Sequence, residues 1–364
     1  MPRARITPRL VSALVFAGAL GVACPAGATA PAFPGLVTTT VTSADGATPI
    51  PDAGSLIATL DVMGLGGRLV DVDITVDIAH TQADNLDVSL VSPDGTTITL
   101  TSDNGGANDD VFAGTTFDDQ AAGTPSAPNV RNFTYVDLSP TGPIQPEEAL
   151  GALVGEHPNG LWALVVVDDT GGQTGALRGW SLALSTVPGL PAGAPVSFPG
   201  PGAAIPNNNL AGVSSPVVVS GLGPRVEDVN VTLDIIHPNA ADLDLFLTAP
   251  SGRRIDLVTD VGGGNDDLYR GATFDDQAGT PVADLPLPTS GTAFTAVVPE
   301  GALAAFLGED PNGTWTLTAV DDSSGNTGTL TGWTLIVRAS TCGDGVVDAG
   351  EQCDDGNGAD CDGC

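Results

Sequence analysis

Carboxylate and amide side chains recur at matched positions in the two halves of this 364-residue chain. The run Asn-Asp-Asp-(x)3-Gly-x-Thr-Phe-Asp-Asp-Gln occupies residues 108–120 and returns at residues 265–277. Hard divalent cations take roughly six to eight oxygen ligands in proteins, so this pattern predicts a calcium site in each half. The predicted ligands are Asp103, Asn108, Asp109, Asp110, Asp118 and Asp119, and then Asp260, Asn265, Asp266, Asp267, Asp275 and Asp276.

A second interpretation of the same residues is turn formation, because Asp and Asn side chains also hydrogen-bond to their own backbone in turns. Doublets that stay in register across both copies favour calcium. We expect weak sites of the extracellular kind, with dissociation constants of about 10⁻⁴ to 10⁻³ M.

The matched positions belong to a long internal repeat. Residues 72–120 return at 229–277 with a constant offset of 157, and a second set of blocks, including His157-Pro158-Asn159-Gly160, returns with an offset of 153. A repeat of about 150 residues has the size of a whole domain rather than of a solenoid unit. The sequence therefore predicts two homologous domains in tandem.

Strand patterns dominate the elements that must position these residues. Residues 69–78, 229–235 and 243–247 alternate apolar and polar side chains, as half-buried antiparallel strands do. Turn sequences separate them, and only 147–153 and 300–307 could form a helical turn or two. We expect an all-β fold of two jelly-roll β-sandwiches.

The N-terminus has the pattern of a secretory signal peptide. Three Arg precede the apolar run 10–23, and small residues follow, so we predict cleavage after Ala28. Lipoprotein anchoring through Cys24 is the alternative, although the residues before it form a poor lipobox. No other apolar run approaches the roughly 20 residues that span a bilayer. We expect a soluble, secreted or cell-surface protein.

Charge narrows the choice of partners. After the predicted signal peptide the chain holds eight Arg, no Lys and all 44 acidic residues, a net charge near −36. Such a chain repels nucleic acid and anionic membranes, which excludes both as partners. The excess negative charge fits either extracellular solubility or cation binding.

An ordered set of motifs resembles the P domain, or Homo B domain, of kexin- and furin-like proprotein convertases. Each copy has an Ile-His step, a polar residue before Leu, a Pro-x-Gly turn, an Asn-Gly-x-Trp step, an Asp-Asp doublet and a Gly-Trp pair. The resemblance implies a jelly roll similar to galactose-binding-like domains that supports a neighbouring protease, and calcium that is also bound by Asp87, Asp242 and Asp244. The expected boundaries are 1–28 signal peptide, 33–187 first domain, 188–204 Pro/Gly linker, 205–339 second domain and 342–364 Cys-rich repeat.

The residues do not provide a protease active site. A serine protease needs a nucleophilic Ser, a His base and an orienting Asp, and the mature chain has only His80, His157 and His237. Neither a G-x-S-x-G elbow nor an H-E-x-x-H helix occurs in the sequence. We therefore expect no enzyme activity, and no catalytic or organic-cofactor-binding residues. His80 and His237 are expected to be hydrogen-bonded structural residues rather than ligands.

The remaining candidates have structural explanations. Trp162, Trp180, Trp315 and Trp333 lie inside apolar runs, which favours core packing over a sugar-binding platform. The tail resembles a myxobacterial-type Cys-rich repeat without the family's further Cys, so we expect an incomplete or a degenerate module. Its four Cys allow three disulfide pairings, and sequence does not choose among them. These are Cys342, Cys353, Cys361 and Cys364.

These observations together predict a secreted, non-catalytic scaffold with calcium-assisted domains and an extracellular protein partner. The first alternative is an accessory protein that acts with a separate secreted serine endopeptidase. The second alternative is lectin-like carbohydrate binding, which rests on the jelly roll alone.

Overall fold

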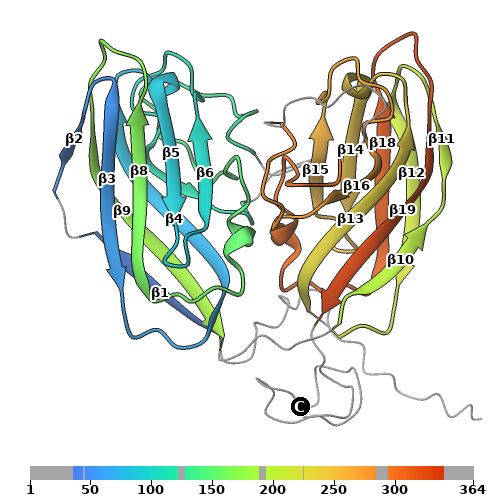
Figure 1. The fold of residues 1–364 in the computed structure, drawn as a ribbon, viewed down its shortest axis with the longest axis horizontal. Helices are drawn as coiled ribbons and strands as arrows, with labels where there is room; N and C mark the ends of the chain where they lie inside the picture. The colour runs from blue at the N-terminus through green and yellow to red at the C-terminus, as the bar shows by residue number, and fades with distance from the viewer. Residues whose placement is uncertain are drawn as a thin grey trace, which may run out of the picture.

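The computed structural model describes residues 36–43, 46–121, 128–187, 194–223, 225–283 and 294–339. The predicted signal peptide and the Cys-rich repeat lie outside the described residues. The described part of the chain forms two β-sandwiches that stand side by side (Figure 1). Within it, no helix is long and apolar enough to cross a membrane.

The first domain consists of two facing antiparallel sheets. One has the strand order β1-β9-β4-β7, with β2 added to β9, and the other has the order β3-β8-β5-β6. The strands are β1 (Val37–Thr42), β2 (Thr48–Ile50), β3 (Gly54–Val62), β4 (Arg68–His80), β5 (Leu86–Val91), β6 (Thr97–Ser102), β7 (Ala113–Phe117), β8 (Gly160–Asp168) and β9 (Gly175–Val187).

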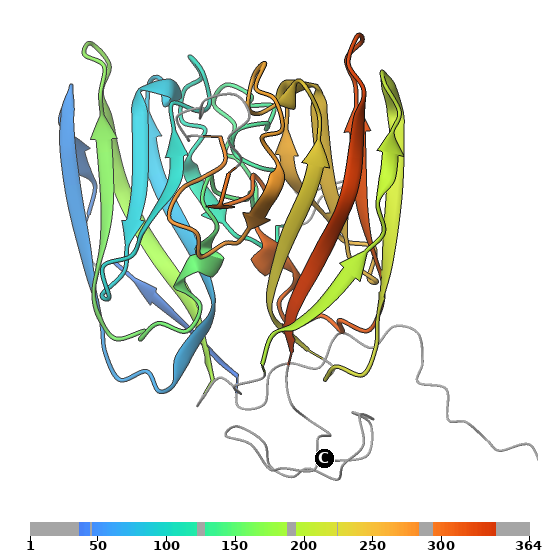
Figure 2. The same ribbon diagram turned by 45° about the vertical axis from the view of Figure 1, so that its right-hand side comes forward.

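The second domain repeats this arrangement. Its sheets have the orders β10-β19-β13-β16-β17, with β11 added to β19, and β12-β18-β14-β15 (Figure 2). The strands are β10 (Val196–Gly200), β11 (Ala203–Ile205), β12 (Asn209–Val219), β13 (Val226–Ile236), β14 (Leu243–Thr248), β15 (Arg254–Thr259), β16 (Arg270–Phe274), β17 (Ala296–Val297), β18 (Gly313–Asp321) and β19 (Gly328–Ala339).

Alternating burial along each strand produces one core per sandwich. In β4, every second residue from Val70 to His80 is buried, so its apolar face lies between the sheets. Trp162 and Trp315 are fully buried in the two cores, and Trp180 and Trp333 are 3% exposed. The tryptophans therefore pack in the core, as the sequence predicts, and none offers an open ring for sugar stacking.

The predicted linker was too long at its C-terminal end. Residues 188–193 lie outside the described residues, but β10 and the first two residues of β11 fall inside the range 188–204, and both strands pair with β19. β10 was not predicted because it contains Pro199, and proline rarely occurs inside strands. Proline is tolerated there because β10 is an edge strand. The second domain thus begins before residue 205.

The described residues also include four short 3-10 turns. They are η1 (Ala83–Asn85), η2 (Leu150–Leu153), η3 (Ala240–Asp242) and η4 (Leu303–Phe306). The turns η2 and η4 form where the sequence allowed one or two helical turns, and they contact each other across the two domains. This contact places two of the predicted metal ligands, Asp119 and Asp276, in a domain interface.

Candidate metal centres and the domain interface

Three carboxylates of the first domain gather at one end of the β3-β8-β5-β6 sheet. Asp87 is the second residue of β5, and Asp103 and Asp169 directly follow β6 and β8. They lie together because Asp87 pairs with Ser102 on one side and with Val167 on the other. Burial, and then the charges of Asp103 and Asp169, raise the pKa of Asp87. Mutual repulsion of this kind is relieved when a cation binds.

The second domain gathers the equivalent carboxylates of Asp244, Asp260 and Asp322. Burial, followed by the charges of Asp260 and Asp322, raises the pKa of Asp244 to about 6. Asp103 and Asp260 both have left-handed backbone, with φ of 54° and 56°. All donors of the two clusters are oxygens, which fits calcium better than zinc. We refer to these sets as the edge clusters.

Most other predicted ligands make turn hydrogen bonds. The Nδ2 atoms of Asn108 and Asn265 donate to the carbonyl oxygens of Gly105 and Gly262, respectively. The Oδ1 atoms of Asp110 and Asp267 accept the backbone N–H groups of His80 and His237, at N···O distances of 3.0 and 3.1 Å. The asparagines therefore make local turn contacts, and the two aspartates tie the same loop to the end of β4 or the residue after β13. Asp109 and Asp266 lie in the same turns.

Asp118 and Asp275 also close turns. Each Oδ1 accepts the backbone N–H of the glutamine two residues later, Gln120 or Gln277. In the first domain Asp118 also lies near Asp73, whose pKa is raised to about 7 by burial and then by the charges of Asp71 and Asp118. Sequence reasoning did not select Asp71 or Asp73, which alternate along a strand like ordinary outward residues.

A buried His–Asp pair crosses each sandwich. The Nε2 of His80 lies 3.2 Å from Asp168 Oδ2, and its Nδ1 lies 2.7 Å from the carbonyl oxygen of Gln82. The second copy repeats the first contact between His237 and Asp321, at 3.3 Å. Both imidazoles are therefore hydrogen-bonded inside the fold, and each faces a carboxylate rather than a serine hydroxyl.

Asp242 joins this pair only in the second domain. One donor atom each of His237, Asp242 and Asp321 lies within 4.8 Å of the others, an arrangement that could hold a metal ion. The two oxygens of Asp242 accept hydrogen bonds from the amides of Asn239 and Asn326. Asn85 takes the place of Asp242 in the first domain, where its Nδ2 donates to the carbonyl oxygen of Thr170. Asp242 thus belongs to a hydrogen-bonded buried cluster, and its charge also acts on Asp260 of the edge cluster.

Asp119 and Asp276 lie buried where the domains meet. Asp119 accepts the backbone N–H groups of Leu150 and Gly151 at 3.1 and 2.7 Å, and Asp276 accepts those of Leu303 and Ala304 at 3.0 and 2.6 Å. Burial, and next the charge of Asp276, raise the pKa of Asp119 well above its ordinary value. Burial also raises the pKa of Asp276 to about 7. Both carboxylates cap a 3-10 turn at its N-terminus.

The contact between the domains has approximate two-fold symmetry. The Nε2 of Gln120 donates to the carbonyl oxygen of Ala304, and the Nε2 of Gln277 donates to that of Gly151, both at 3.2 Å. Gly151 and Ala304 are equivalent positions that meet at the axis. A Cβ atom on Gly151 would lie 2.3 Å from the Cβ of Ala304 and 3.0 Å from Asp276 Oδ2. The glycine is therefore needed for the domains to approach this closely.

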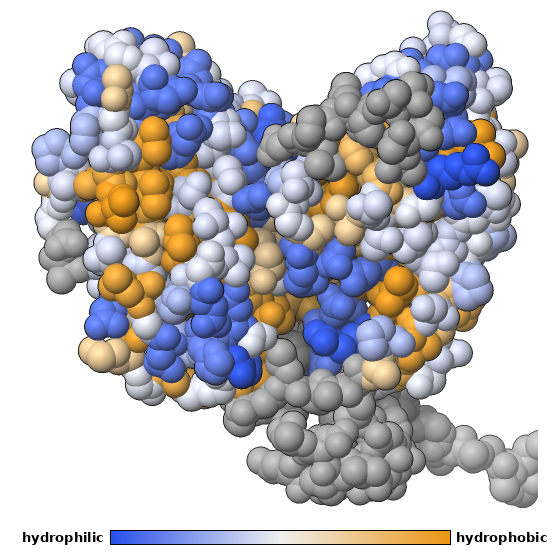
Figure 3. Space-filling model, in the orientation of Figure 1, coloured by the Kyte–Doolittle hydropathy of each residue, from blue (hydrophilic) through white to orange (hydrophobic). Residues whose placement is uncertain are grey.

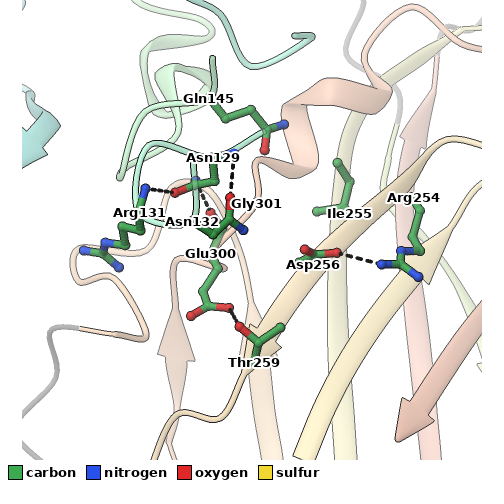
Figure 4. A pocket seen from close by; sticks show the side chains of 10 residues that line it. All are labelled: Asn129, Arg131, Asn132, Gln145, Arg254, Ile255, Asp256, Thr259, Glu300 and Gly301. Atoms are coloured by element: carbon green, nitrogen blue, oxygen red, sulfur yellow. Dashed lines mark hydrogen bonds and ion pairs between the residues drawn. The ribbon is translucent and has the colours of Figure 1, made fainter. Parts of the chain in front are cut away.

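A polar cavity of about 190 Å³ lies beside this contact (Figure 4). Asn129 links the domains there, because its Nδ2 donates to the carbonyl oxygens of Pro146 and Glu300, at 2.9 and 2.8 Å. The carboxylate of Glu300 accepts the hydroxyl of Thr259, and burial raises its pKa to about 7. The lining comes from both domains: Asn129, Arg131, Asn132, Gln145, Arg254, Ile255, Asp256, Thr259, Glu300 and Gly301.

Sequence reasoning missed Asp169 and Asp322 as members of the edge clusters. The signal was present, because the Asp-Asp doublets at 168–169 and 321–322 repeat in register. In each doublet the first carboxylate is buried against a histidine and the second follows the end of a strand at the sheet edge. The doublet thus joins the buried pair to the edge cluster.

The family model described as the proprotein convertase P-domain matches the chain twice, at residues 69–184 and 226–337. These matches cover most of both sandwiches and more than half of the chain. No curated protein matches the chain.

Similar solved structures share low identity with the chain. A serine protease of Aeromonas sobria in complex with its chaperone ORF2 shows 20% identity and a TM-score of 0.28, over 42% of this chain and 28% of that one. The serine protease of Aeromonas sobria alone shows 20% identity and a TM-score of 0.26, over 41% and 28%. The STIV MCP shows 9% identity and a TM-score of 0.21, over 83% and 97%. The chain thus spans under a third of the length of the protease chains.

Proposed function

The chain belongs to the proprotein convertase P-domain family, and on that premise we propose that it is a secreted, non-catalytic scaffold whose two domains bind calcium. P domains are non-catalytic accessory domains in proprotein convertases. The edge clusters are the observation that carries the calcium proposal. Equivalent carboxylates gather at the same end of the sheet in both copies, and burial followed by their like charges raises the pKa values of Asp87 and Asp244.

Calcium would act on the stability of both domains. A site with a dissociation constant of about 10⁻⁴ to 10⁻³ M stabilises its folded domain by roughly 1.4 to 2.7 kcal/mol at about 10 mM calcium. For domains of this size that corresponds to a rise of roughly 3 to 10 °C in the midpoint of thermal unfolding. The measurement is thermal unfolding of the mature chain in EDTA and then in calcium, at constant ionic strength.

Matched variants separate the edge clusters from the turns. Asp103→Asn and Asp260→Asn remove one carboxylate from each edge cluster, and asparagine retains the left-handed backbone. Asp110→Asn and Asp267→Asn are the control, because these residues have the same backbone conformation, with φ of 56° and 57°, in the other turn. We expect the first pair alone to lose the calcium-dependent shift. A wild-type midpoint that calcium leaves unchanged would refute calcium binding.

Family membership favours a second proposal, an accessory role beside a separate secreted serine endopeptidase. The chain would then bind and stabilise that enzyme in trans. The test is to mix the purified chain with a secreted serine protease encoded beside it and to follow the half-life of peptidase activity. An unchanged half-life at saturating chain would exclude this role for that protease.

A further inference from the structure

The outer face of the β3-β8-β5-β6 sheet carries more apolar surface in the first domain than its equivalent does in the second. Along β8, the outward positions hold Leu161, Ala163, Val165 and Val167, and Ile57 of β3 pairs with Val165. Ile57 and Leu161 are 63% and 59% exposed. Figure 3 shows apolar side chains gathered over this part of the first domain. We call these five residues the β8 face.

The second domain provides an internal control for this surface. The positions equivalent to 161, 163 and 165 hold Thr314, Thr316 and Thr318, and Ser214 stands opposite Thr318 where Ile57 stands opposite Val165. Threonine and valine are both good strand formers, so strand propensity does not explain the aliphatic choice. The second domain exposes Val218 beside Thr314 on this face, but it lacks the aliphatic run along the central strand. Contiguous exposed apolar surface of this kind marks interaction sites.

The charges around the β8 face restrict what can bind there. Its charged neighbours are Asp61, which pairs with Leu161 across the sheet, and Asp87, which pairs with Val167. The three Arg side chains of the first domain are engaged elsewhere, Arg131 with Glu147 and Arg178 with Asp77 and Asp110, while Arg68 contacts His157. A second copy of this chain is disfavoured, because it carries the same net charge, near −36 after the predicted signal peptide.

We propose that the β8 face is the docking surface for an extracellular protein segment with an aliphatic centre flanked by Lys or Arg. The proposal deepens the scaffold function, on which it rests, and it involves none of the calcium-dependent readouts. A basic residue at the rim would approach Asp61, which belongs to no edge cluster, while aliphatic side chains cover the five residues of the face.

The area of the β8 face indicates how tightly a partner can bind there. Nine residues of β8 at about 3.3 Å each extend roughly 30 Å, and β3, β8 and β5 together span roughly 15 Å, or about 450 Å². Stable interfaces bury about 800 Å² on each partner. The β8 face therefore forms a reversible contact rather than a permanent one.

The probe is a labelled amphipathic peptide with Leu on one face and Lys at its edges, measured by fluorescence anisotropy in about 0.15 M salt. Its two controls replace Leu by Ser, which retains the charge, or Lys by Glu, which retains the apolar face. We expect the wild-type chain to bind the Leu/Lys peptide at least about tenfold more tightly than either control. Equal binding of the Ser/Lys peptide would reduce the contact to charge alone and overturn the proposal.

Exchange variants locate the contact. Ile57→Ser, Leu161→Thr and Val165→Thr together install the residues of the second domain, and we expect a loss of at least about tenfold in affinity. The reverse exchange, Ser214→Ile, Thr314→Leu and Thr318→Val together with Val218→Asp at the position of Asp61, should add a second binding site in an otherwise wild-type chain. This reverse exchange does not depend on whether the first variant folds. Wild-type affinity in a folded first variant, or unchanged stoichiometry in a folded second variant, would contradict the assignment.

Calcium separates the two proposals. We expect peptide binding to be retained in EDTA, because no residue of the β8 face belongs to an edge cluster. Absence of a calcium-dependent midpoint shift together with peptide binding would refute calcium binding and leave the docking surface intact. A calcium-dependent shift without selective peptide binding would refute the docking surface and leave calcium binding intact.

Discussion

The two domains have one fold but different surfaces, and the difference separates what the fold requires from what each copy adds. The buried His–Asp pair and the carboxylate caps of η2 and η4 are identical in both copies. The outward positions of β8 and β18 differ in chemistry although both strands have the same register. Each domain therefore serves as a control for the features of the other. A feature in both copies belongs to folding or to a shared ligand, and a feature in one copy belongs to that copy's contacts.

The same comparison explains how acidic surface is tolerated. Asp73 of the first domain lies against Asp71 and Asp118, and its pKa is raised to about 7. The second domain has Asn230 at that position, where its amide can donate to Asp275 Oδ1 at 3.2 Å. The first domain thus retains three carboxylates that repel one another and favour a shared proton. The second domain has a neutral amide in place of one carboxylate, and this amide hydrogen-bonds to Asp275.

The largest expected effect concerns pH at the domain contact, where the copies act together. A carboxyl whose pKa is higher in the docked state binds its proton more tightly there, so docking weakens as pH rises through the interval between its two pKa values. At this contact burial raises the pKa of Asp276 to about 7, and burial followed by the charge of Asp276 raises the pKa of Asp119 well above its ordinary value. Small-angle scattering should show a compact chain near pH 5 and separated domains near pH 8.

Other buried carboxyls shift in the same direction, including Asp73 and Glu300, so a variant must isolate the contact. We expect Asp276→Asn to flatten the pH dependence of the radius of gyration. Asp61→Asn removes one charge from the exposed sheet face and serves as the control. A radius that stays constant from pH 5 to pH 8 in the wild-type chain would contradict this account.

The next effect exchanges the two residues at the symmetry axis. Gly151→Ala should weaken docking by about 1 to 3 kcal/mol, because the new Cβ overlaps that of Ala304. Adding Ala304→Gly should restore docking, since the pair is then merely reversed. A double-mutant cycle on the free energy of unfolding measures this coupling. Strictly additive effects would show that the two residues do not meet in solution.

The smallest expected effect concerns a hydrogen bond that only one copy makes. Trp333 Nε1 donates to Ser215 Oγ at 2.8 Å, whereas the Nε1 of Trp180 is buried without a partner. Ala58 stands at the position of Ser215, since each pairs with the equivalent leucine across the sheet. We expect Ala58→Ser to stabilise the first domain by about 1 kcal/mol and Ser215→Ala to destabilise the second by a similar amount. Urea unfolding followed by tryptophan fluorescence should resolve both. Equal midpoints for wild type and Ala58→Ser would mean that the new hydroxyl does not reach the indole.

Much of the fold could be predicted from the sequence because it depends on local periodicity. The alternation at 69–78 and 229–235 predicts β4 and β13, and the repeat offsets predict two domains. The turns η2 and η4 form where the sequence allowed them. β10 was missed because its proline and glycine content matches a linker, and only its pairing with β19 identifies it as a strand.

The candidate site was only partly predictable, because identical motifs serve different purposes. The doublets Asp118–Asp119 and Asp275–Asp276 have the composition of calcium loops, but one residue closes a turn and the other caps a 3-10 turn across from its counterpart. Repetition in register was the argument for calcium, and a two-fold contact between copies demands the same repetition. Sequence cannot separate these causes without knowing which surfaces meet.

The single methyl group at the symmetry axis also bears on ancestry. If one copy existed alone, its dimer would place the same residue on both sides of the axis. Two alanines would collide there, whereas two glycines would leave room. A single position thus decides whether an unduplicated ancestor could pair with itself, and fusion of two genes removes that restriction by letting the two sides diverge. In a joined duplicate, one side of the axis can carry Gly151 and the other Ala304. Separate copies of a single gene could not form this pair without also forming the alanine–alanine pair that collides.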